Sequence, residues 1–165
     1  MTPRVIPSGN SSNPFLEYWL PMSLDHPATF IGLLLSSLSH VMMNHFVSGD
    51  FHLTQISMEQ ISSNLRICYR DAMNSINREL RNPLKSLNDA TILAVLMCVE
   101  NPLPYKADAE PFKSPFQAPL QGLQWLNVHS AREPNLLHQE GLCRLIELRG
   151  GLASITTPGL AAAAF

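Results

Sequence analysis

Charged residues are scarce in this 165-residue sequence, since Asp, Glu, Lys and Arg together make up 15% of it. Soluble domains typically carry about 25% charged residues. The 11 basic and 13 acidic residues nearly balance, which gives a formal net charge of −2. This balance argues against a free-standing nucleic-acid-binding protein, because such proteins usually show a strongly basic surface or stripe.

Cysteine is also scarce, and its spacing excludes two kinds of site. Cys68, Cys98 and Cys143 lie too far apart to form a Cys-x-x-Cys pair, so a zinc ribbon and a dithiol redox motif are absent. Each cysteine stands among apolar residues at a helix-like position. We therefore expect buried, reduced thiols in an intracellular protein.

The usual signatures of metal, phosphate and catalytic sites are missing as well. His40 and His45 are five residues apart and face different sides of a helix, and Leu142 stands four residues after His138. The sequence has no glycine-rich phosphate loop and no Gly-x-Ser-x-Gly elbow, and its carboxylates are scattered. We expect a protein that is not an enzyme and holds no metal or cofactor.

Long hydrophobic runs are limited to residues 28–46, where serine, histidine and asparagine interrupt the second half. A membrane span needs about 20 mostly apolar residues, so a buried helix is favoured over a spanning one. Residues 1–14 lack the apolar core of a secretory signal and are typical of a flexible tail. The aromatic segment "FLEYWLP" that follows is expected to anchor the chain to the domain.

Helical periodicity dominates the rest of the sequence. A first helix is predicted to start near Asp25, His26 and Pro27, with Asp25 as a candidate cap, and to run to about Phe46. A second helix is predicted over 55–82, where apolar residues recur every three or four positions: Ile61, Leu65, Cys68, Ala72, Ile76 and Leu80. A third helix follows Asn88 or Ser86 as its cap. Its segment "ATILAVLMCVE" is apolar on nearly all sides, which predicts a position at the centre of a bundle.

The remaining segments complete an all-α prediction. Prolines at high density rule out a continuous helix over 101–119, where a variable surface loop is favoured over a binding loop. Residues 120–131 predict one more helix, and Pro134 opens another over residues 138–152. No segment alternates as a strand does. The sequence therefore predicts an irregular bundle of about five helices with a Pro-rich loop.

Basic residues spread over about half the circumference of the predicted 55–82 helix and just beyond it. A solvated outer face is favoured over a surface for an acidic partner or nucleic acid. The residues are Arg66, Arg70, Arg78, Arg81 and Lys85.

The segment "HQEGLCRLIELRGGL", residues 138–152, predicts one amphipathic helix stopped by two glycines. Glu140 and Arg144 are spaced for a helix ion pair, and Arg149 suits the negative end of the helix dipole. Gly141 costs the helix about 1 kcal/mol relative to alanine, so we expect a second helix to cross closely there. The apolar side is predicted to hold Leu137, Leu142, Leu145, Ile146 and Leu148.

The same segment carries a pattern that resembles the central part of fungal-specific transcription-factor domains. These domains are the regulatory regions found downstream of binuclear zinc-cluster DNA-binding modules in fungal regulators. The pattern is His-x-x-Gly-Leu-x-x-Leu-x-x-x-Arg-Gly-Gly, formed here by His138, Gly141, Leu142, Leu145, Arg149, Gly150 and Gly151. Residues 15–41, 65–83 and 87–100 are similar, in the same order, to the family's earlier helices, so the resemblance covers roughly residues 15–162.

The resemblance implies a non-catalytic regulatory domain that acts in transcription through protein partners or a small-molecule effector. It implies a nuclear location, with the cytoplasm as the alternative. The family's DNA-reading module holds zinc with six closely spaced cysteines, which have no counterpart here. The zinc-binding and DNA-binding roles therefore have no residues to be carried onto. The family's helices also continue past the Arg-Gly-Gly motif, so we expect residues 15–165 to be a partial domain with uncovered apolar surface.

Two other functions remain open on the sequence alone. A small helical enzyme or a carrier of an apolar ligand would use the interior of the bundle as a pocket. A membrane-associated protein would use residues 28–46.

Overall fold

The structure is a computed structural model that describes residues 13–48, 55–82, 87–101 and 135–164. This part is 84% helical and contains no strand, which confirms the all-α prediction. The elements are a π-helical turn Phe15–Trp19, α1 Leu20–Asp25, α2 Pro27–Ser48, α3 Gln55–Leu80, α4 Asp89–Val99, α6 Leu136–Arg149, a 3₁₀ turn Leu152–Ser154 and α7 Leu160–Ala163. The proline-rich loop and the helix expected over 120–131 lie outside the described residues, apart from Asn101.

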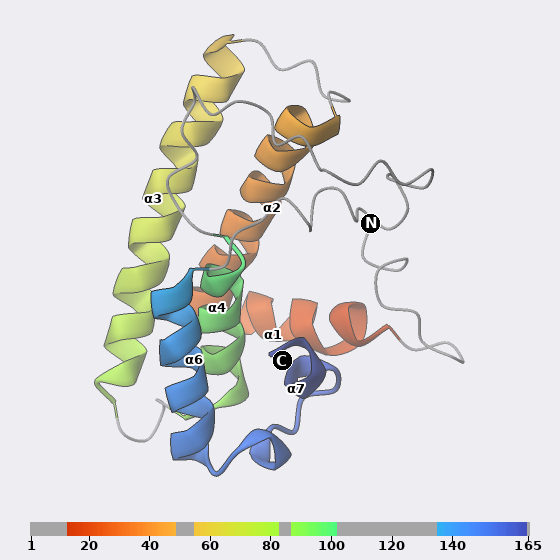
Figure 1. Cartoon of the computed structure of the whole chain (residues 1–165), viewed down its shortest axis with the longest axis vertical. Coiled ribbons are helices and arrows are strands. Elements are labelled where there is room, and N and C mark those ends of the chain that lie inside the picture. Colours follow the sequence, from red (N-terminus) through yellow and green to blue (C-terminus); the bar gives the residue numbers. More distant parts are fainter. Residues whose placement is uncertain (1–12, 49–54, 83–86, 102–134, 165) are drawn as a thin grey trace.

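Helix α4 occupies the centre of the bundle, as its apolar composition predicts. It packs against α2, α3 and α6, and every one of its residues is buried (Figure 1). Asn88 caps it, because the Asn88 side chain accepts a hydrogen bond from the Thr91 backbone N–H at 2.7 Å. Of its two candidate caps, Asn88 is therefore the one in use.

Helices α2 and α3 form a long pair beside α4 (Figure 1). Leu65, Ala72 and Ile76 of α3 are buried, whereas Leu80 is 38% exposed, so the predicted apolar stripe is wrong at its last position. The reason is geometric: each step of four residues turns the side chain about 40° further round the helix. Three successive steps of four carry Leu80 off the core-facing side.

The start of α2 also differs from the prediction. Asp25 is the last residue of α1 and does not cap α2. The chain leaves the helical conformation only at His26, whose φ and ψ are −119° and 120°. A residue before proline disfavours the helical region, and Pro27 is the first residue of α2. Two helices are therefore joined by one extended residue.

The aromatic segment near the N-terminus anchors the chain, as expected. The Trp19 indole Nε1–H donates a hydrogen bond to the Pro158 carbonyl oxygen at 2.9 Å. Trp19 also packs against the core, which includes the fully buried Leu160 of α7. The two ends of the described chain are thereby held together.

The close helix crossing lies at Gly32 of α2. A Cβ atom added at Gly32 would lie 2.9 Å from the sulfur and 3.3 Å from Cβ of Met97 in α4. At Gly141 of α6 an added Cβ would meet nothing within 4 Å, so the crossing predicted there is wrong. Close packing therefore explains the glycine at position 32. Within the described part of this chain, it does not explain the glycine at position 141.

We expect Gly32→Leu and Gly141→Leu to change stability in opposite directions. Gly32→Leu forces α2 away from α4 and should lower the free energy of unfolding by about 1–3 kcal/mol. Gly141→Leu gains helix propensity at an exposed position and should raise it by roughly 0.5–1 kcal/mol. Urea unfolding followed by circular dichroism measures both. If both substitutions changed the free energy of unfolding in the same direction, the placement of the close helix crossing at Gly32 would be contradicted.

Candidate functional site

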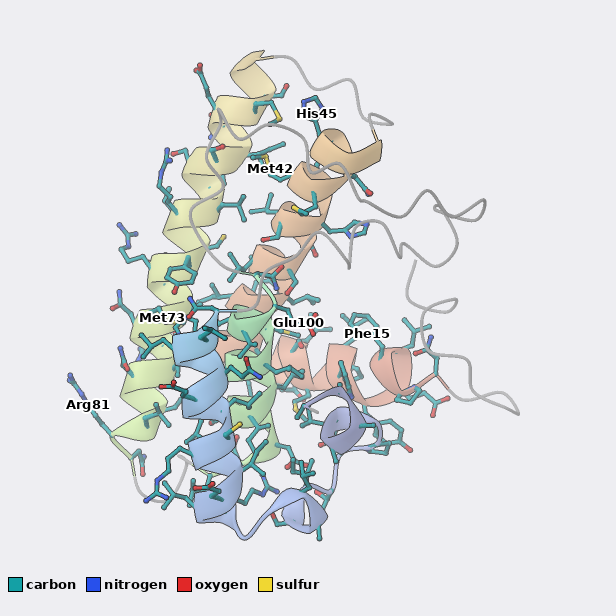
Figure 2. The ribbon with its side chains drawn as sticks, in the orientation of Figure 1. Phe15, Met42, His45, Met73, Arg81 and Glu100 are labelled. Carbon is teal, nitrogen blue, oxygen red and sulfur yellow. The ribbon has the colours of Figure 1, made fainter. Side chains whose placement is uncertain are left out.

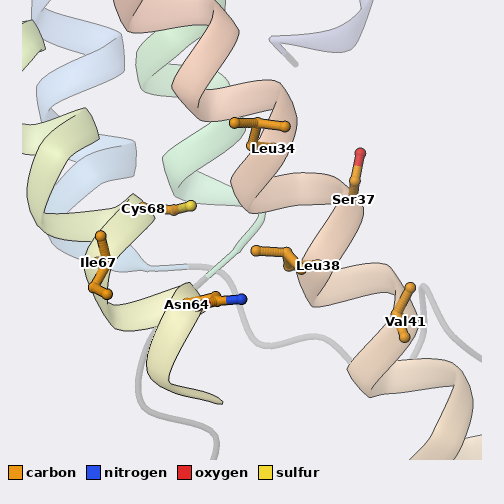
Figure 3. Close-up of a pocket in the computed structure, with 7 residues that line it drawn as sticks. All are labelled: Leu34, Ser37, Leu38, Val41, Asn64, Ile67 and Cys68. Atoms are coloured by element: carbon orange, nitrogen blue, oxygen red, sulfur yellow. The ribbon is translucent and has the colours of Figure 1, made fainter. Parts of the chain in front are cut away.

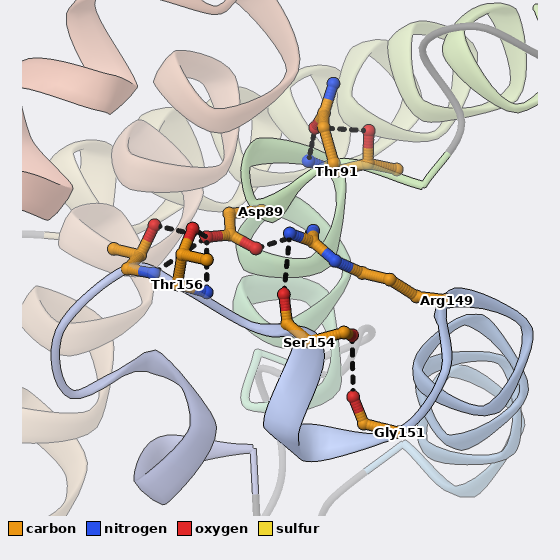
Figure 4. A network of polar contacts seen from close by, with 8 residues as sticks. Asp89, Thr91, Arg149, Gly151, Ser154 and Thr156 are labelled. Atoms are coloured by element: carbon orange, nitrogen blue, oxygen red, sulfur yellow. Dashed lines mark hydrogen bonds and ion pairs between the residues drawn. The ribbon is translucent and has the colours of Figure 1, made fainter.

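A buried polar network surrounds Asp89, the first residue of α4 (Figure 4). The Asp89 side chain is 9% exposed, and its Oδ1 forms an ion pair with Nη1 of Arg149. Its Oδ2 accepts hydrogen bonds from the backbone N–H and hydroxyl groups of both Thr156 and Thr157, at 2.6–3.1 Å. One carboxylate therefore binds the end of α6 and the segment that follows it.

The Arg-Gly-Gly part of the sequence pattern builds the other half of this network. Gly150 ends α6 in the left-handed conformation, with φ 109° and ψ 20°, as predicted. The Gly151 N–H donates to the Ile146 carbonyl at 2.8 Å and the Gly150 N–H to the Glu147 carbonyl at 3.0 Å, which is a Schellman motif. The turn directs the chain back so that Arg149 Nη2 donates to the Ser154 carbonyl at 3.1 Å.

The protonation state of Asp89 follows from these contacts. Burial by itself raises the pKa of this carboxyl, but the hydrogen bonds from Thr157 and Thr156 and the charge of Arg149 lower it further than burial raises it. The pKa therefore lies below its ordinary value, and Asp89 is ionised at neutral pH. A carboxylate held in that state serves as a fixed charge in the fold rather than as a proton carrier.

His138 contributes a second contact between distant segments. Its Nε2 lies 2.6 Å from the Tyr69 hydroxyl oxygen of α3, and Asn135 caps α6 by accepting from the His138 N–H at 3.3 Å. Burial lowers the pKa of His138, so the ring is neutral at pH 7. In the tautomer with its proton on Nδ1, Nε2 accepts the hydrogen bond from the tyrosine hydroxyl. His138 thus fastens the beginning of α6 to α3.

The other residues of the pattern are placed partly as predicted. Leu142 and Ile146 are buried and Leu145 packs against the core, but Leu137 and Leu148 are 74% and 56% exposed, so the predicted apolar side is wrong at these two positions. Arg144 pairs with Glu147 at 3.1 Å instead of with Glu140. The residues of the pattern do not converge on one point, since His138 and Arg149 lie at opposite ends of α6.

The cysteines and carboxylates show no metal-binding cluster in the described ranges. No group of three or more His, Cys, Asp or Glu side chains is arranged there to hold a metal ion. Cys98 is buried, which raises its pKa to about 12. Cys68 is half-buried, but Cys143 is exposed, so the expectation of three buried thiols is wrong for Cys143.

A concave surface with an apolar lining lies between α2 and α3, and we call it the α2–α3 groove (Figure 3). Its volume is about 390 Å³. Leu34 and Ile67, on opposite sides of it, are 41% and 45% exposed. The lining residues are Leu34, Ser37, Leu38 and Val41 of α2 and Asn64, Ile67 and Cys68 of α3.

The two helices that form the groove have different outer faces. None of the 22 residues of α2 is Asp, Glu, Lys or Arg. The outer face of α3 is basic and exposed at Arg66, Arg70, Arg78 and Arg81, while Lys85 lies outside the described residues. Figure 2 shows Arg81 projecting away from the bundle at the end of α3. This is the solvated face that the sequence favours.

Comparisons with known proteins give no match: no family model, no curated protein and no solved structure matches this chain. Among the described residues, no helix combines the length and the apolar character that crossing a membrane requires.

We expect Asp89→Asn to lower the free energy of unfolding by about 3 kcal/mol, because it leaves the Arg149 guanidinium buried without its counter-ion. Asp71→Asn is the matched control. It removes the partner of Arg70 in an exposed pair and should cost at most about 1 kcal/mol. Chemical denaturation at pH 7 measures both. Equal losses would show that the Asp89 network carries no special weight.

The Tyr69–His138 contact should make stability depend on pH. Because the folded protein holds the pKa of His138 below the ordinary value of 6.5, the unfolded chain takes up the proton first on acidification. Its contribution to stability is therefore complete above pH 6.5 and is lost as the pH falls through 6.5 towards the folded pKa. The urea midpoint measured between about pH 7.5 and 5.5 should fall less in His138→Gln, which still accepts a hydrogen bond but does not titrate. An identical fall in both proteins would contradict the assignment.

Proposed function

We propose that this chain is a non-catalytic regulatory domain of the fungal transcription-factor type, which acts in the nucleus through protein contacts at the α2–α3 groove. The observation that carries the proposal is the groove itself, which exposes Leu34 and Ile67 on either side of an apolar lining. Exposed apolar surface rimmed by polar residues is typical of a site for another protein. The neighbouring α2 face adds no charge to it.

The roles of the sequence pattern support the same function. His138 and Arg149 are the two residues of the pattern that carry ionisable side chains, and each is engaged in a contact that holds α6 in place. Gly150 and Gly151 form the turn that brings Arg149 to Asp89. These residues build a scaffold, and the surface that such a scaffold presents does the binding.

A carrier of an apolar ligand is the second candidate, and the size of the groove favours it. Ligand pockets have volumes of roughly 300–1,000 Å³, and the α2–α3 groove has about 390 Å³. Ligand pockets also bury most of their ligand, whereas this groove runs open along the surface between two helices (Figure 3). An open groove suits the side chains of another protein better than a small molecule.

We expect the purified chain to bind no zinc in stoichiometric amount and no DNA with sequence specificity. Metal analysis and fluorescence anisotropy with a DNA library at physiological salt measure the two properties. Native mass spectrometry of the same sample tests the second candidate. If the chain carried an apolar ligand, one such molecule per chain would be detected. Stoichiometric zinc, or DNA selectivity that survives physiological salt, would overturn the proposal.

A further inference from the structure

We draw no further inference here: the strongest candidate, the α2–α3 groove together with the uncharged outer face of α2 beside it, carries none, because nothing in the structure shows what covers this apolar surface.

Discussion

The ion pair between Asp89 and Arg149 is the constraint on which the arrangement of the helices depends. Asp89 stands at the positive end of the α4 dipole and Arg149 at the negative end of the α6 dipole, so each charge also suits its own helix. At the other end of α4, the Asn135 N–H donates to the Val99 carbonyl at 3.0 Å. Helix α6 is thus fixed to α4 at both of its ends, and the two helices run antiparallel.

The central position of α4 requires contacts of this kind. A helix buried on every side has polar groups at its ends that water does not reach, and those groups need partners within the protein. Asn88 supplies one for the Thr91 N–H at the first turn, and the Asn135 N–H supplies one for the Val99 carbonyl at the last. The Thr91 hydroxyl also donates to Glu79 of α3 at 3.0 Å. Helix α2 has the opposite problem: one side packs against α4 closely enough to need Gly32, while its outer side is apolar and open.

Periodicity and capping signals predicted the helices well, because both depend on neighbours along the chain. They predicted α3, α4 and a glycine turn at the end of α6, with Asn88 as one of two candidate caps for α4. These signals failed to predict contacts between helices, because such contacts depend on which distant segment of the chain packs against a residue. Gly141 has the same local signature as Gly32, yet only Gly32 of these two faces another described helix. No local pattern indicated that Asp89 and Arg149, or Tyr69 and His138, would meet, since each pair is far apart in the chain.

The bond from the Trp19 indole to the Pro158 carbonyl has a mechanical consequence. It joins the first and last described segments, so a pulling force applied to the two ends is borne at that contact and at the Asp89 network before it reaches α2 or α3. The long helix pair is therefore shielded from tension at the ends.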